Sequence, residues 1–214
     1  QQINIICTLN HNLYVQKREK TYFEFVQVKD VYGKQIKYKK DAVNINVCVD
    51  NLILETTKYN MDEFLELMGL CISDELIEIV VKNAEINISV TKQQNNIYLS
   101  EILNKMNINY NIISDRIIIS DTHKELFDYL KVLLVNASDR YLPEFVWNLS
   151  QKQSIILMES LLHHNNYEQD FCEFNTLSNM LASDIQRLAL HCGWSGTIQL
   201  NNIRVTNNNL TVQI

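Results

Sequence analysis

Residues 61–75 carry the pattern that most constrains the fold of this chain. The stretch, MDEFLELMGLCISDE, has apolar residues over a wide helical face, and Asp62 is placed to cap its start. Gly69 lies inside it, where a glycine costs about 1 kcal/mol relative to alanine and indicates the close approach of another backbone. Asp74 and Glu75 follow at the carboxyl end, where the helix dipole disfavours anions unless a cation is bound. The pattern predicts a buried helix that ends in a solvated acidic tip or at a cation.

A second helical pattern covers residues 150–166, SQKQSIILMESLLHHNN, in which Ser150 and Gln153 have the spacing of a capping box. From residue 58 the periodicity reads helix, strand, strand, helix, strand, strand, helix, and this order restarts after Pro143, without the final helix. The expected segments after the first helix are a hairpin at 76–92, a helix at 98–106, strands at 108–113 and 116–119, a helix at 122–134 capped by Asp121 or Thr122, a shortened hairpin at 167–175, a helix at 177–191 that stops at Gly193, and strands at 194–200, 203–206 and 210–214.

Residues 1–57 alternate apolar and polar side chains and read as a small all-β region. The chain is therefore expected to have an α+β fold with three parts. They are the β region at 1–57, a first half at 58–141 and a second half at 142–214.

The net charge of −6 counts against indiscriminate nucleic-acid binding. One local basic run exists, formed by Lys34, Lys37, Lys39 and Lys40 with tyrosines interleaved. It fits either a solvated strand-and-turn surface or a set of phosphate contacts.

Other features of the composition concern location. No apolar run is long enough to cross a membrane, and no secretory signal heads the chain. The five cysteines are odd in number and lack metal-type spacing. Reduced thiols are therefore expected, and with them an intracellular location in the cytoplasm or the nucleus.

Several stretches, in the same order, resemble intein-type LAGLIDADG (DOD) homing endonucleases. Residues 67–75, LMGLCISDE, resemble the first signature of that family, and residues 150–166 resemble the second. Residues 142–153 and 177–198 look like its connector and second-half helix, and TLNHNLYVQKR at 8–18 looks like a splicing block of the intein (Hint) domain. The resemblance implies a tandem pseudo-twofold repeat, preceded by a partial Hint region.

The same resemblance implies a metal-dependent site on double-stranded DNA. Two signature helices would pack side by side through Gly69 and Ser160, and each would deliver one carboxylate to Mg²⁺ at a scissile phosphodiester. Asp74 matches the first acid and metal ligand, but Asn165 stands where the second acid belongs. Because a neutral amide binds Mg²⁺ more weakly than a carboxylate, double-strand cleavage is expected to be lost, while nicking through Asp74 stays open. The flanking sheets would form a saddle that reads the major groove.

Thr8 and His11 match the splicing block, in which the histidine polarises a peptide bond, although a histidine in a strand loop also fits simple hydrogen bonding. Cys7 directly precedes Thr8, and residues 210–214 lack a terminal His-Asn pair, so the chain as written is not expected to splice itself. Expected partners are duplex DNA and the flanking host segments (exteins), with the protein as a monomer. The alternatives are a non-catalytic DNA-binding module and a purely structural relic.

Overall fold

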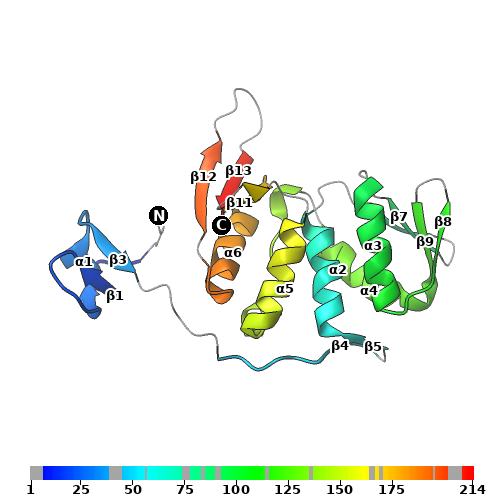
Figure 1. The fold of residues 1–214 in the computed structure, drawn as a ribbon, viewed down its shortest axis with the longest axis horizontal. Helices are drawn as coiled ribbons and strands as arrows, with labels where there is room; N and C mark the ends of the chain where they lie inside the picture. The colour runs from blue at the N-terminus through cyan, green and yellow to red at the C-terminus, as the bar shows by residue number, and fades with distance from the viewer. Residues whose placement is uncertain are drawn as a thin grey trace.

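The computed structural model describes residues 7–38, 45–55, 57–73, 78–82, 85–89, 93–113, 116–134, 137–163, 167–168, 171–194, 196–201 and 209–214. The fold is mixed α+β, as the sequence predicts. At its centre two helices, α2 (Met61–Ser73) and α5 (Gln151–Leu162), lie side by side, and a sheet flanks the pair on each side (Figure 1). In the part of the chain that the structure describes, no helix has the length and apolar content needed to span a membrane.

The helix α2 leads into a four-stranded antiparallel sheet with the order β6-β7-β9-β8. The elements that follow α2 are β6 (Glu78–Lys82), β7 (Glu85–Ser89), α3 (Gln93–Lys105), β8 (Tyr110–Ile113), β9 (Arg116–Ser120), the 3-10 helix η1 (Asp121–His123) and α4 (Lys124–Leu133). Two further 3-10 helices, η2 (Ala137–Asp139) and η3 (Glu144–Asn148), connect α4 to α5.

The helix α5 leads into a second four-stranded antiparallel sheet, with the order β10-β11-β13-β12. Its elements are β10 (Tyr167–Glu168), β11 (Phe171–Thr176), α6 (Asn179–His191), β12 (Thr197–Asn201) and β13 (Asn209–Gln213). In both sheets the spatial order of the strands is first, second, fourth, third, and a helix separates the second strand from the third. The strand expected at 203–206 lies outside the described residues.

One continuous apolar core joins the helix pair to both sheets. The first sheet contributes Ile86, Ile88, Ile117 and Ile119, which are almost fully buried because alternate residues of a strand point to the same face. From the second half, α6 buries Leu181, Ile185 and Leu188. The helix ends at His191, and Gly193 two residues later has φ +80°, a left-handed conformation that glycine adopts without steric cost.

Residues before α2 form two small sheets. The first has the order β2-β1-β3, with β1 (Asn12–Lys17), β2 (Glu24–Gln27), the short helix α1 (Val28–Val31) and β3 (Ile36–Tyr38). It has its own apolar cluster, centred on Val15, Val26 and Val31. The second is the hairpin of β4 (Asn51–Leu54) and β5 (Thr57–Asn60), and its Leu52 and Leu54 pack against the main core.

Three expected helix starts differ from the structure. Asn60, not Asp62, caps α2, because the Asn60 Oδ1 atom accepts from the backbone N–H groups of Asp62 (2.9 Å) and Glu63 (3.2 Å). The helix expected at 98–106 begins earlier, at Gln93. The helix expected at 122–134 begins at Lys124, and Thr122 does not cap it, because its hydroxyl pairs with the Ser120 hydroxyl at 2.8 Å.

The amino end of α6 generates a stability prediction. The buried Ser178 hydroxyl accepts from Leu181 N–H (3.1 Å) and donates to the Arg140 carbonyl (2.6 Å). We expect Ser178→Ala to lower the free energy of unfolding by about 1–2 kcal/mol, because it removes a cap and leaves a buried carbonyl without this donor. Ser183→Ala, an exposed serine on the same helix, is the matched control and should cost under about 0.5 kcal/mol. Urea unfolding measures both, and equal losses would contradict the capping role.

Candidate functional site

The helices α2 and α5 approach each other closely at Gly69. A Cβ atom added to Gly69 would lie 2.6 Å from the Ser160 Cβ and 3.1 Å from the Leu157 carbonyl oxygen, so no larger residue fits without displacement. The Ser160 hydroxyl donates to the Glu66 carbonyl at 2.5 Å, which joins the two helices by a hydrogen bond at the same level. The structure thus brings together the two residues that the sequence assigned to helix packing.

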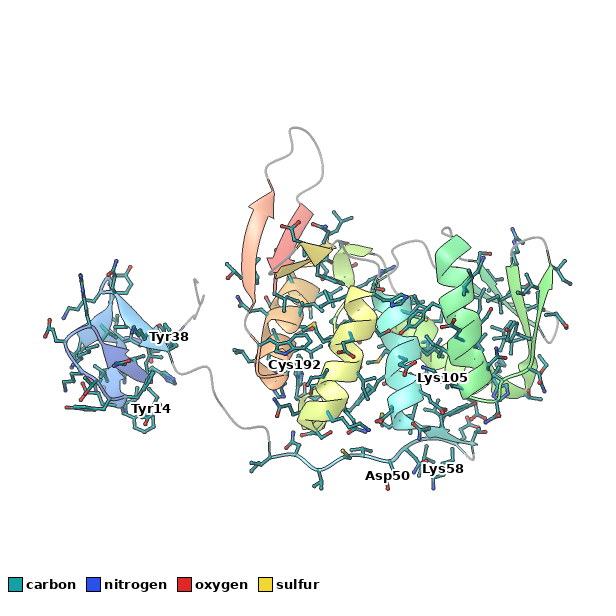
Figure 2. All side chains as sticks on the ribbon, in the orientation of Figure 1. Tyr14, Tyr38, Asp50, Lys58, Lys105 and Cys192 are labelled. Carbon is teal, nitrogen blue, oxygen red and sulfur yellow. The ribbon has the colours of Figure 1, made fainter. Side chains whose placement is uncertain are left out.

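An extended segment, residues 45–50, passes the amino ends of both helices, and Asp50 lies on it (Figure 2). The Asn46 amide donates to the carbonyls of Trp147 and Leu149, both at 3.2 Å. The Gln153 amide accepts from the Val49 N–H (3.0 Å) and donates to the Val49 carbonyl (2.7 Å), as a neighbouring strand would. The capping box is therefore only half formed, because Ser150 caps α5 while the Gln153 side chain binds this segment.

An ion pair links the same amino ends. The Asp62 carboxylate of α2 accepts from Lys152 Nζ at 2.8 Å and from the Gln153 amide at 3.1 Å, and both donors lie on α5. Partial burial raises the pKa of Asp62, but the hydrogen bonds from Lys152 and Gln153 outweigh it and lower that pKa below its ordinary value. The pair therefore stays charged at neutral pH and holds the two helix starts together.

A buried arginine holds the carboxyl end of α2. Arg140 is 5% exposed, and its Nη1 atom donates to the Ile72 carbonyl at 2.8 Å. A cation is favoured at a helix carboxyl end, where the last carbonyls lack partners and the dipole is negative. Asp74, the predicted first acid, follows this end and lies outside the described residues. The carboxyl end of α2, which precedes Asp74 in the sequence, is therefore held by a buried charge from the connector between the halves.

The carboxyl end of α5 is covered by an aromatic pair. The ring of His163 stacks on Tyr98 of α3 with centroids 3.7 Å apart and planes at 14°. Burial raises the pKa of the Tyr98 phenol. Asn165, at the position of the second acid, lies outside the described residues. Among the residues that are described, no three His, Cys, Asp or Glu side chains gather as metal ligands.

The two splicing candidates, Thr8 and His11, lie in the turn before β1, and both are exposed. The His11 N–H donates to the Thr8 carbonyl at 3.0 Å, and the His11 carbonyl accepts from Val28 N–H at 2.9 Å. The turn thus brings the two residues together through their backbones and leaves the side chains at the surface.

Two of the four predicted DNA-binding lysines, Lys39 and Lys40, lie outside the described residues. Lys34 follows α1 and donates to the Asp30 carbonyl at 2.7 Å, and Lys37 is an exposed residue of β3. Lys34 and Lys37 line a hollow of about 910 Å³ beside β1 and β3. They belong to the N-terminal sheet, not to the sheets that flank the helix pair.

One cluster has partners that the sequence did not predict. The Arg187 guanidinium of α6 lies 3.8 Å from the centre of the Trp147 ring, and Asp184 accepts from the Leu142 N–H at 2.9 Å. Burial raises the pKa of Asp184. These contacts attach α6 to the connector, and they join residues too far apart in sequence for spacing to predict them.

No protein-family model matches this chain. Two curated proteins are similar along most of it. The ATP-dependent Clp protease proteolytic subunit of Chlamydomonas moewusii is 28% identical over a gapped alignment of 231 residues that covers 92% of this chain. The DNA-directed RNA polymerase subunit beta C-terminal section of Stigeoclonium helveticum is 26% identical over a gapped alignment of 251 residues that covers 91% of this chain. The chain spans only 22% and 23% of the lengths of these two proteins.

Similar solved structures include the homing endonuclease I-DmoI. Its complex with DNA and Mn matches with a TM-score of 0.46 and 15% identity, over 71% of this chain and 89% of that one. Its mesophilic variants match with a TM-score of 0.47 and 16% identity, over 71% and 88%.

The helix contact generates a second stability prediction. Gly69→Ala should lower the free energy of unfolding by about 1–3 kcal/mol, because overpacking outweighs the better helix propensity of alanine. Combining it with Ser160→Gly removes the clashing Cβ, so the double variant should lose less than the sum of the two single losses. Urea unfolding of all three variants measures this coupling. A stabilised Gly69→Ala variant, as expected at an open helical position, would contradict the close approach.

Proposed function

We propose that this chain is a DNA-binding domain of the LAGLIDADG homing-endonuclease type. The observation that carries the proposal is the contact of Gly69 with Ser160, which joins two helices that each lead into a sheet of the same strand order. Side-by-side helices with one sheet on each side would present two similar surfaces to a duplex. The signature-like stretches at 67–75 and 150–166 fall on these same two helices.

The two halves are proposed to be pseudo-twofold repeats of one unit. Both follow the order helix, strand, strand, helix, strand, strand, and both sheets place the fourth strand between the second and the third. Few residues are shared between the halves, so the likeness is one of topology. A monomer with two such repeats would carry two DNA-facing sites. A protein with a single repeat would obtain its second site by forming a dimer.

Cleavage would depend on two positions at the same spacing beyond the helix contact, Asp74 after Gly69 and Asn165 after Ser160. Asp74 would hold a divalent cation, Mg²⁺ in the proposal, which when bound supplies an activated water and a stabilised leaving oxygen. Asn165 offers a neutral amide in place of the second carboxylate. The proposal is therefore duplex binding with cleavage reduced to one strand.

The chain is also proposed to be part of an inserted splicing element. Its two curated relatives bear names of unrelated activities, a protease subunit and a polymerase subunit, and this chain matches only about a fifth of each. A shared segment in otherwise unrelated proteins is what an insertion element would produce. Thr8 and His11 would belong to its splicing part, and the flanking host segments would be its partners inside the cell.

A nicking assay tests the endonuclease proposal. Duplexes that the chain retains from a random library at low salt are cloned into supercoiled plasmid and incubated with Mg²⁺ or Mn²⁺. The natural chain should nick without linearising, Asp74→Ala should not nick, and Asn165→Asp should linearise the plasmid. Asp74→Ala should still bind the duplex, because that carboxylate serves the reaction and not the affinity.

The other outcomes separate the alternatives. Duplex binding without cleavage by any variant would overturn the catalytic part and leave a DNA-binding module. Absence of duplex binding at low salt would overturn the proposed function and leave a structural relic.

The splicing proposal has its own measurement. Mass spectrometry of the mature host protein, purified from its own cells, should find the flanking host segments joined and the residues of this chain missing. A mature host protein that retains these residues would contradict excision.

A further inference from the structure

The N-terminal sheet, β2-β1-β3, carries aromatic rings on the face opposite its apolar cluster. Strand register places Tyr14 of β1 beside Phe25 of β2, and their ring centroids are 4.9 Å apart. The ring of Phe23 lies 5.8 Å from that of Tyr14, with the two planes at 29°. Phe25 is 74% exposed and Tyr14 is 43% exposed, and Figure 2 shows Tyr14 at the surface of this sheet. The alternate residues Val15 and Val26 are buried, so the sheet has a core on one face and exposed rings on the other.

Polar side chains border the rings on this face. The register pairs Asn12 with Gln27 at one end of β1. At the other end it pairs Gln16 with Lys37. Six residues therefore form what we call the aromatic face, namely Asn12, Tyr14, Gln16, Phe25, Gln27 and Lys37. The structure describes all six, and none of them is a carboxylate.

The charge around the aromatic face favours a polyanion. Residues 7–38 contain six lysines and arginines and three acidic residues, a net charge of +3, whereas the whole chain has a net charge of −6. One of the three acids, Glu24, is on the opposite face of the sheet and forms two ion pairs with lysines. Arg18, Lys34 and Lys37 line the hollow of about 910 Å³ beside β1 and β3, and no acidic residue is among the described residues that line it. This part of the chain therefore attracts phosphates, although the whole chain is acidic.

We propose that the aromatic face binds single-stranded nucleic acid. Unpaired bases stack on Tyr14 and Phe25, and such stacking tolerates any sequence because every base has a π face. The amides beside the rings donate to and accept from base edges, and Lys37 contacts a phosphate. A duplex cannot use the rings in this way, because its bases are already stacked on each other. The site is therefore distinct from the duplex surface of the helix pair, and the inference does not depend on the proposed function.

A nucleic-acid strand fits this face better than a protein partner does. Interfaces between proteins are enriched in aromatic residues but depleted in lysine, and Lys37 lies on this face. Amides border the rings at both ends of β1, so the rings do not extend into a wider apolar patch. A strand with unpaired bases uses all three kinds of group, because the rings meet base faces, the amides meet base edges and the lysine meets a phosphate.

The test is the affinity of the full chain for a fluorescent thymidine oligonucleotide of about 15 nucleotides, measured by anisotropy over a series of salt concentrations. A uridine oligonucleotide of the same length is measured beside it. Binding of either strand supports the proposal, and the tighter of the two identifies the sugar of the ligand. A duplex of the same length should compete poorly, because its bases cannot stack on the rings.

Substitutions at the face separate stacking from other contributions. Phe25→Leu keeps an apolar side chain but removes the ring, so it should weaken strand binding about tenfold, whereas Phe25→Tyr should retain the affinity. Lys37→Gln should lower the slope of log affinity against log salt by about 0.7. Tyr22→Leu is the matched control, because Tyr22 is an exposed tyrosine outside the aromatic face and Lys20 Nζ lies 5.0 Å from the centre of its ring. NMR spectra of the amides of β1, β2 and β3 establish that each variant keeps the fold of the sheet.

Two results would overturn this inference. If the folded natural chain binds neither strand, the aromatic face is a contact surface for a protein. If Phe25→Leu binds as tightly as the natural chain, or if an equal concentration of duplex displaces the strand, charge alone attracts the strand and the rings do not stack on bases. Neither result bears on the proposed function, which duplex binding and nicking test separately.

Discussion

The packing of α2 against α5 is the interaction on which the rest of the structure depends. Gly69 lets the helices approach until the Ser160 hydroxyl reaches the Glu66 carbonyl, and no side chain at position 69 could keep that distance. Each helix then leads into a sheet with the same strand order. The separation and relative orientation of the two sheets therefore follow from one glycine contact, supported by Asp62 and Lys152 at the helix starts.

Much of this arrangement could be predicted from local patterns. The periodicity of residues 61–75 and the interior glycine predicted the buried helix, and alternation predicted the hairpin of β8 with β9. The first residues of the helices were predicted less accurately, because a side chain can cap a helix only if it does not form hydrogen bonds with other groups. Thr122 could cap α4 by type, but its hydroxyl binds Ser120. Similarly, Gln153 has the spacing of a capping box, yet it binds Val49.

Local sequence patterns did not predict the contacts between distant segments that surround the site. The Arg140 contact with Ile72 and the stacking of Arg187 on Trp147 join segments distant in the chain, and neither has a spacing signature. Asp74 and Asn165 are assigned by resemblance and lie outside the described residues. The interior glycine indicated locally that another backbone approaches position 69, whereas the choice of Ser160 as its partner was implied by the family resemblance of the two helical stretches.

The segment at 45–50 has a consequence for which substitutions the chain tolerates. Gln153 binds the Val49 backbone and not its side chain, and Asn46 contacts carbonyls of the connector. The Gln153 side chain of α5 therefore binds this segment through its backbone. A substitution of Val49 would preserve both hydrogen bonds wherever the backbone stays extended. Any residue other than proline can therefore take the place of Val49, because that position contributes only its backbone N–H and carbonyl. Position 46 is more demanding, because its side chain has to donate to the connector carbonyls.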